Sequence, residues 1–238
     1  MKKIRVLVID DSALIRKMLT EILNSCSDIE VIGSAEDPID AREKIKQLSP
    51  DVLTLDIEMP KMSGLQFLKN LMRLRPMPVI MVSTLTERGA PETLEALEVG
   101  AVDYICKPKA NTEVKLKIFS NELITKVRMA SSAHVQPYRQ NKTVMALTKS
   151  EAGYSKIIAI GASTGGIEAI KEVLASVPAH CPPILISQHI PKVFSTSFAE
   201  RLDRFLEVSV FEAQEGMLIR PGCVYIAPGD YHLTVASS

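Results

Sequence analysis

The sequence predicts an α/β protein made of two units, each built on a parallel sheet, and three observations lead to this prediction. Short β-rich runs alternate with helix-patterned segments up to about residue 125. The alternation stops over a polar stretch and resumes near residue 156. The length of 238 residues is sufficient for two domains of ordinary size. We therefore expect a doubly wound first unit over 1–125, a linker over 126–152 and a second, smaller α/β unit over 153–238.

The first unit opens with an apolar run, Ile4–Ile9, that reads as a strand and ends at acidic residues. Asp37 followed by Pro38 is typical of a helix N-cap with proline in the first turn. Hydrophobic spacing predicts the other elements, which are strands over 31–32, 52–55, 79–82 and 102–105, and helices over 15–23, 41–48, 65–72, 93–97 and up to about 130.

The second unit repeats the alternation over fewer residues. The expected elements are a strand over 156–160, a helix over 165–175, a strand over 184–187, a helix over 194–206, and strands over 207–211 and 223–227. Gly229-Asp230 is a two-residue turn signal before the apolar run 231–235. The sequence therefore predicts a β-hairpin at this end of the chain.

Composition and charge exclude several classes of protein. Lys and Arg total 28 and Asp and Glu total 28, which argues against electrostatic binding to nucleic acid or to an anionic membrane. No apolar run approaches the length of a membrane span, so no membrane insertion is expected. The N-terminal apolar run breaks at Asp10-Asp11, which predicts a cytoplasmic protein rather than a secreted one. The four cysteines are widely spaced, which favours reduced thiols over disulfides or zinc ligands.

Chemically active side chains follow the strands of the first unit. In an open parallel sheet, ligands bind beyond the carboxyl ends of the strands. Those ends carry Asp10-Asp11, Asp56, Ser83-Thr84 and Lys107-Pro108. Three carboxylates at one edge favour a hard cation such as Mg²⁺, beside which a carboxylate could accept a phosphoryl group. The alternative is that each Asp only caps the following helix, which is the common role of a single Asp at such a position.

These residues resemble the receiver domain of response regulators, whose fold is flavodoxin-like. The motifs are Asp10-Asp11, Asp56 followed by Met59-Pro60 and Gly64, Met81-Val82-Ser83, and Asp103-Tyr104 before Lys107-Pro108. The resemblance implies that Asp56 is phosphorylated by a histidine kinase. It implies that Mg²⁺ is held by Asp10, Asp11, Asp56 and the backbone at Glu58. It further implies a phospho-switch made of Ser83, Tyr104 and Lys107, and a cis peptide bond before Pro108.

A glycine-rich turn carries a serine in the second unit. The run Ile158–Gly166 reads as strand, tight turn and helix, which would expose Ser163 at a helix N-terminus. His189 ends the next predicted strand, so His189 could act as general base toward Ser163. Backbone N–H groups of Thr164, Gly165 and Gly166 could stabilise an oxyanion. Close packing at the turn, a structural histidine and a phosphate-binding loop remain the alternatives, although no Walker-type lysine is present.

Both motifs together resemble the effector domain of chemotaxis protein-glutamate methylesterases. The matching segments are Ile160–Gly166, Gln188-His189-Ile190-Pro191, Ala213 with Gly216, and Val224–Gly229. The resemblance implies that Ser163 is the nucleophile and His189 the base for hydrolysis of glutamate γ-methyl esters on chemoreceptors, releasing methanol, with possible deamidation of glutamines. Phosphorylation of Asp56 would activate the esterase.

The family's triad also uses an Asp from a Gly-rich Asp-Gly motif, and the 238 residues contain no such motif. We therefore expect an incomplete, C-terminally truncated esterase unit with a Rossmann-like fold. The competing hypothesis is a phospho-switched binding module with weak or no catalysis. A DNA-binding regulator is disfavoured, because the second unit is not helix-turn-helix.

Overall fold

The structure is a computed structural model that describes residues 2–84, 90–108, 112–135 and 156–236. Two sheets, one of five strands and one of four, organise the described chain into two units. Within the described residues, no helix combines the length and apolar character that a membrane span requires. The two-unit α/β fold predicted from the sequence is therefore confirmed.

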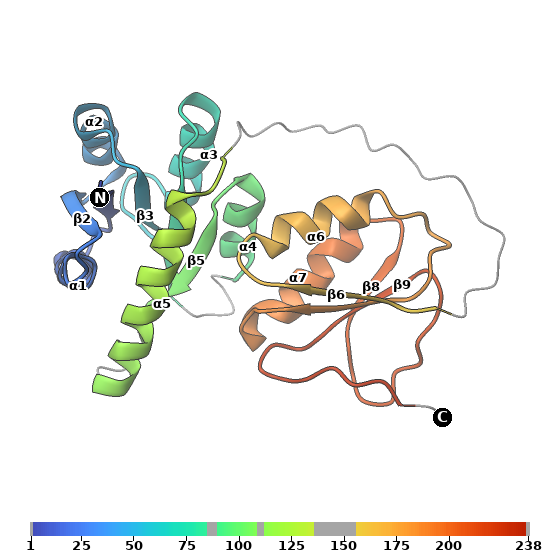
Figure 1. Cartoon of the computed structure of the whole chain (residues 1–238). Helices are drawn as coiled ribbons and strands as arrows, with labels where there is room; N and C mark the ends of the chain where they lie inside the picture. Colours follow the sequence, from blue (N-terminus) through green and yellow to red (C-terminus); the bar gives the residue numbers. More distant parts are fainter. Residues whose placement is uncertain (1, 85–89, 109–111, 136–155, 237–238) are drawn as a thin grey trace. The chain divides into compact units, whose positions relative to one another are not determined.

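The first sheet is parallel throughout, with the strand order β2-β1-β3-β4-β5 (Figure 1). This is the order of the flavodoxin-like doubly wound fold. Its elements are β1 (Ile4–Ile9), α1 (Ala13–Asn24), β2 (Ile29–Ala35), α2 (Pro38–Leu48), β3 (Val52–Asp56), α3 (Gly64–Leu74), β4 (Val79–Ser83), α4 (Ala90–Val99), β5 (Asp103–Cys106) and α5 (Glu113–Ser131).

The core of the first unit lies on both faces of this sheet. Every residue of β3 and β4 is buried, as expected for parallel strands covered by helices on each side. On one face, Val8, Ile80 and Val82 pack with Leu19 and Leu23 of α1 and with Leu123 and Val127 of α5. The strand ends that carry the acidic residues are therefore held by a rigid, water-excluding support.

Helix ends follow the signals in the sequence. The Asp37 carboxylate accepts hydrogen bonds from the N–H groups of Ile39 and Asp40 at 2.9 Å, so Asp37 caps α2 with Pro38 in its first turn, as predicted. At the other end of the unit, α5 continues through Ser131, past the predicted boundary at 125. Residues 136–152 of the predicted linker, and the next three residues, lie outside the described residues.

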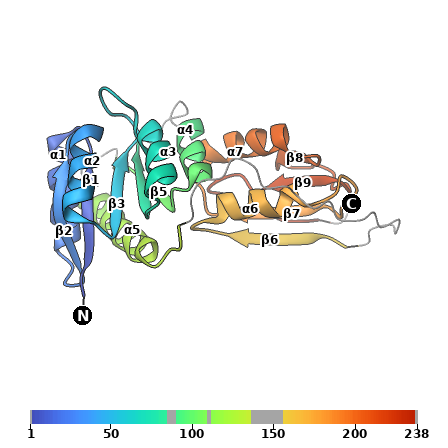
Figure 2. The ribbon, with the colours of Figure 1, turned by 90° about the horizontal axis from the view of Figure 1, so that it is seen from above.

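The second sheet is also fully parallel and has the order β6-β7-β9-β8 (Figure 2). Its elements are β6 (Ile158–Ala162), α6 (Gly166–Ala175), β7 (Ile184–Gln188), α7 (Lys192–Phe205), β8 (Ser209–Glu212) and β9 (Cys223–Ile226). Among the described strands β6 lies at one edge, and Ile158 is 40% exposed. The strand that leads into the serine turn is thus much less covered than the strands of the first sheet.

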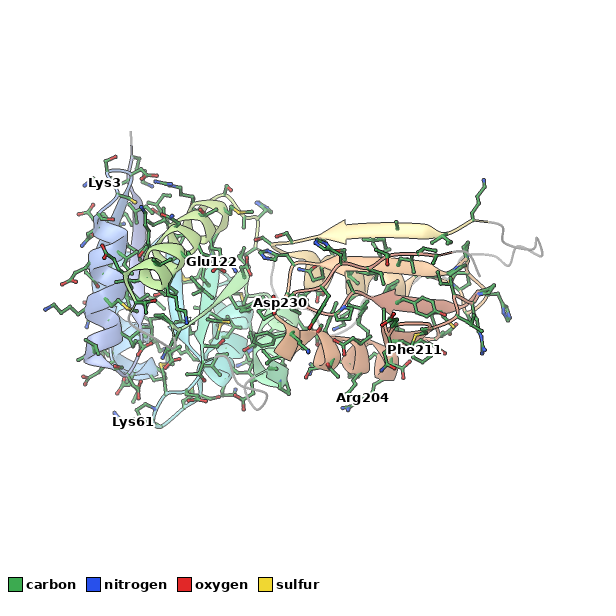
Figure 3. All side chains as sticks on the ribbon, turned by 90° about the horizontal axis from the view of Figure 1, so that it is seen from below. Lys3, Lys61, Glu122, Arg204, Phe211 and Asp230 are labelled. Atoms are coloured by element: carbon green, nitrogen blue, oxygen red, sulfur yellow. The ribbon has the colours of Figure 1, made fainter. Side chains whose placement is uncertain are left out.

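The predicted C-terminal hairpin is wrong. Residues 229–230 form a turn, but residues 231–236 do not form a strand. Asp230, labelled in Figure 3, has φ of 68° in this turn. The physical reason lies in the strand order, because β9 already pairs with β7 on one side and β8 on the other. No edge of β9 is left for an antiparallel partner.

Candidate functional site

Three carboxylates meet at the carboxyl edge of the first sheet. One ligand oxygen each of Asp10, Asp11 and Asp56 lies within 4.8 Å of the other two. Asp10 is 0% exposed and Asp56 is 2% exposed, whereas Asp11 reaches solvent. Asp10 and Asp11 follow β1, and Asp56 ends the neighbouring β3. The parallel pairing of these two strands therefore brings together the residues predicted from the sequence.

A single ammonium group compensates part of this negative charge. Lys107 Nζ lies 2.9 Å from Asp10 Oδ2 and 2.9 Å from Asp56 Oδ1. Burial and the nearby Asp10 raise the pKa of Asp56 to about 6, although Lys107 opposes the shift. Burial alone would lower the pKa of Lys107, but its hydrogen bonds to Asp10 and Asp56 outweigh burial and raise it. The pocket holds excess negative charge that a cation would relieve.

The residues predicted as a phospho-switch line two adjacent strands. Ser83 ends β4, is 2% exposed, and its hydroxyl has no hydrogen-bond partner in the described chain. Tyr104, on β5, is 7% exposed, and its ring lies 5.0 Å from Lys126 Nζ. Burial raises the pKa of the Tyr104 hydroxyl far above its usual range. An unpaired buried hydroxyl at Ser83 is unfavourable unless something binds it.

One expectation at this edge is wrong. The described residues contain no cis peptide bond, so the bond between Lys107 and Pro108 is trans. The trans form is the lower-energy form of most X-Pro bonds, and Lys107 reaches both carboxylates without isomerisation. The acidic cluster does not include the Glu58 carboxylate, and the metal-binding role of the Glu58 main chain stays a prediction.

Sequence reasoning missed three contacts that support the pocket. Arg16 Nη1 donates to the carbonyl oxygens of Asp10 at 2.8 Å and Asp11 at 2.9 Å. Lys61, labelled in Figure 3, lies on the loop after β3 and forms a 2.6 Å ion pair with Asp37. A Cβ on Gly64 would overlap the carbonyl oxygen of Asp56, so this loop needs glycine there. The position of Arg16 in α1, five and six residues after the two aspartates, was the available signal.

In the second unit, the turn after β6 places Ser163 at the start of α6. Gly165 is the N-cap residue and has φ of 74°, a conformation that favours glycine. Ser163 is exposed, as the motif predicted. The Gly166 N–H donates to the Ser163 carbonyl at 2.8 Å, which closes the turn. This N–H is therefore already engaged within the turn, so Gly166 is not available as an oxyanion donor.

His189 lies directly beside this turn. The parallel register pairs Ala162 with Gln188, so Ser163 and His189 are the next residues on neighbouring strands. The N–H of His189 donates to the carbonyl of Ala162 at 3.0 Å, which ties the two turns together. Both residues are exposed, and no hydrogen bond joins their side chains in the described part of the chain. Catalytic hydrogen bonds are often long before substrate binds, so the placement suits a nucleophile and its base.

Within the described chain, the two aspartates of the second unit, Asp203 and Asp230, do not orient His189. The Asp203 carboxylate accepts a 2.8 Å hydrogen bond from the N–H of Val210 and thereby holds the start of β8 to α7. Asp230 is exposed in the turn after β9. Neither forms a hydrogen bond with His189 among the described residues.

Comparisons with known proteins agree with the division of the chain into these two units. Residues 6–119 match the family model "Response regulator receiver domain", and residues 158–238 match "CheB methylesterase". The first unit is similar in structure to the response regulator domain of Thermotoga maritima CheB, with a TM-score of 0.51 and 47% identity over 56% of this chain and 99% of that one.

Two curated relatives match the chain over its whole length. Each is a protein-glutamate methylesterase/protein-glutamine glutaminase, one from Nitrosomonas europaea at 54% identity and one from Saccharophagus degradans at 55% identity. The chain spans 69% and 70% of the length of these two relatives.

The protein is thus a response regulator in which a phosphoacceptor domain is joined to a serine esterase domain. The buried aspartate pocket lies in the first domain, and the Ser163 turn lies beside His189 in the second. The chain belongs to the protein-glutamate methylesterase/protein-glutamine glutaminase family.

Proposed function

We propose that this protein is a phosphorylation-activated esterase that hydrolyses glutamate γ-methyl esters of chemoreceptors and deamidates receptor glutamines. The observation that carries the proposal is the β6–β7 register, which sets Ser163 and His189 side by side at an exposed sheet edge. An exposed edge suits a substrate that is itself a protein. The predicted binding module without catalysis would need neither side chain, and no observation favours it.

Ser163 Oγ attacks the ester carbonyl carbon while His189 accepts the hydroxyl proton. The bond to the methoxy group then breaks, and His189 returns the proton to methanol. A water molecule, deprotonated by His189, then attacks the acyl carbon, the bond to Ser163 Oγ breaks, and His189 returns the proton to Ser163 Oγ. The released acid ionises to the glutamate carboxylate. The main-chain N–H of Gly165, at the start of α6, would stabilise the oxyanion.

In the first unit, Asp56 is the proposed phosphoacceptor. A carboxylate oxygen of Asp56 forms the new bond to phosphorus, and the bond to the histidine of a kinase breaks. Lys107, already 2.9 Å from Asp56, and the unpaired hydroxyl of Ser83 would bind the phosphoryl oxygens. Tyr104, on the neighbouring strand, would report the change in Ser83.

The acidic pocket also fits Mg²⁺, which prefers oxygen ligands. Asp10, Asp11 and Asp56 converge within 4.8 Å against a single ammonium, so the donor set suits a divalent cation. The main-chain carbonyl of Glu58 would complete the protein ligands. Bound Mg²⁺ would supply charge neutralisation for the phosphoryl group.

The decisive experiment measures methanol release from methylated chemoreceptor membranes with wild-type protein and with Ser163→Ala. We expect Ser163→Ala to lose methanol release completely while Asp56 still accepts phosphate, because the two residues belong to different units. Ser209→Ala, which changes an exposed serine on β8, is the matched control and should behave as wild type. Methanol release that survives Ser163→Ala would contradict the proposal.

A further inference from the structure

Gln188 occupies the position between the two turns of the esterase site. It is the last residue of β7 and pairs in register with Ala162, the last residue of β6. Although polar, it is 8% exposed. Its side-chain Nε2 donates to the carbonyl oxygen of Ser163 at 3.0 Å and to that of His189 at 3.3 Å. One carboxamide therefore joins the main chains of the proposed nucleophile and the proposed base.

The position of the Gln188 side chain requires a glycine beside it and leaves one of its polar atoms without a hydrogen bond among the described residues. A Cβ on Gly166 would overlap Oε1 of Gln188, so the helix start must be glycine for the carboxamide to fit. Oε1 itself is buried and has no hydrogen-bond partner among the described residues. A buried unpaired acceptor is unfavourable, and an apolar side chain of the same length would avoid it. The need for the two donated hydrogen bonds explains why a carboxamide stands here.

Strand pairing does not require these two bonds. The His189 N–H already binds the Ala162 carbonyl, and the Ser163 carbonyl already accepts from the Gly166 N–H. The carboxamide acts one residue farther along, where the chain leaves the sheet at Ser163 and His189. It therefore fixes the spacing of the two turns rather than the pairing of the two strands.

We infer that Gln188 is a positioning residue for the esterase reaction, holding the Ser163 turn at reacting distance from His189. This inference rests on the proposed function of Ser163 and His189. A misplacement of reacting groups by about 1 Å can reduce a rate about 100-fold. Loss of the bridge should thus lower turnover while leaving receptor binding unchanged.

The test is Gln188→Met in the full chain, since methionine keeps the length of the side chain and removes both donors. We expect kcat for methanol release to fall by about 10- to 100-fold, with KM within about twofold. The rate of covalent labelling of Ser163 by a small fluorophosphonate should fall in parallel, because labelling needs the activated hydroxyl but not the receptor. Gln214→Met, which changes an exposed glutamine, is the matched control.

Gln188→Glu provides a second variant. It keeps the shape of the side chain, but a carboxylate has no donor and a protonated carboxyl has only one, so it cannot donate to the carbonyls of both Ser163 and His189. We expect turnover and labelling as low as in Gln188→Met, with a thermal midpoint near that of wild type for at least one of the two variants.

The outcomes separate this inference from the proposed function. Wild-type kcat and labelling rates in Gln188→Met, with Ser163→Ala inactive, would overturn the role of Gln188 alone. Unfolding of both Gln188 variants would also overturn it, because Gln188 would then support the fold rather than the spacing of the site. Methanol release in Ser163→Ala would instead reject the assignment of the nucleophile.

Discussion

The two units of this chain place their sites at the same part of a parallel sheet but support them differently. In the receiver unit, β3 is buried along its whole length, and Asp56 at its end is 2% exposed. In the esterase unit, β6 is an edge strand of the described sheet, and Ile157 and Ile158 before the serine turn are 46% and 40% exposed.

This difference teaches how each site obtains its properties. The acidic pocket depends on burial, which strengthens the interactions among Asp10, Asp56 and Lys107 and raises the pKa of Asp56. The esterase site depends on hydrogen bonds that hold exposed residues in place, including those donated by Gln188 and by the N–H of His189. Electrostatic interactions therefore give the acidic pocket its properties, whereas hydrogen bonds that fix the positions of Ser163 and His189 do so in the second site.

The largest expected effect is a complete loss of phosphorylation with no change in the reactivity of Ser163. Asp56→Asn should abolish incorporation of phosphate from a phosphorylated histidine kinase, because an amide cannot form the acyl phosphate. Fluorophosphonate labelling of Ser163 in the unphosphorylated chain should be unchanged, and Glu43→Gln, at an exposed site on α2, should take up phosphate normally. Phosphate incorporation in Asp56→Asn would place the acceptor on another carboxylate, such as Asp11.

The next effect tests the difference in burial with one residue type. Ile80→Ala on β4 removes a 0% exposed side chain from the core and should cost about 3 to 4 kcal/mol of unfolding free energy. Ile158→Ala on β6 removes a 40% exposed side chain and should cost less than about 1 kcal/mol. Calorimetry that follows the transition of each unit gives both values. Equal costs would show that β6 is covered in solution.

The smallest expected effect concerns the charge of Asp56. Its folded pKa of about 6 exceeds the unfolded value of 3.8, so the folded chain holds the proton more tightly. The ionised group therefore costs stability above pH 6, and the cost disappears as the pH falls toward 3.8. Without Mg²⁺, Asp56→Asn should stabilise the receiver unit by up to about 3 kcal/mol at pH 8 and by almost nothing near pH 4.

Denaturation in EDTA at several pH values measures the unfolding free energy of Asp56→Asn and of wild type. Glu43→Gln, which changes an exposed carboxylate, is the control. A destabilised Asp56→Asn at pH 8 would mean that the ion pair with Lys107 outweighs burial and repulsion from Asp10. Added Mg²⁺ should reduce the difference between Asp56→Asn and wild type, since a cation would relieve the same repulsion in wild type.

Much of the fold could be predicted because its signals are local. Asp37 and Pro38 mark the start of α2, and strand residues alternate with helical stripes in both units. The acidic cluster could also be predicted, since parallel strands bring their carboxyl ends to one edge. The hairpin at Gly229-Asp230 could not be excluded from the sequence, because its absence depends on which strands flank β9.

Interactions between residues far apart in the sequence could not be predicted. Gln188 was noted only as part of a motif, because its bond to Ser163 depends on the β6–β7 register. The ion pair between Lys61 and Asp37 joins two loops that are far apart in the sequence. The trans bond before Pro108 could not be foreseen either, because either isomer is compatible with the sequence.

The direct connection of β6 to β7 through α6 has a consequence for regulation. Ser163 directly follows β6 and His189 directly follows β7 in one continuous strand–helix–strand segment. The hydrogen bond from the His189 N–H to the Ala162 carbonyl joins the carboxyl ends of the two strands. Their spacing is therefore set locally. Phosphorylation of Asp56 would then not be needed to bring Ser163 and His189 together. We therefore expect activation to raise the rate of substrate binding more than the rate of bond cleavage.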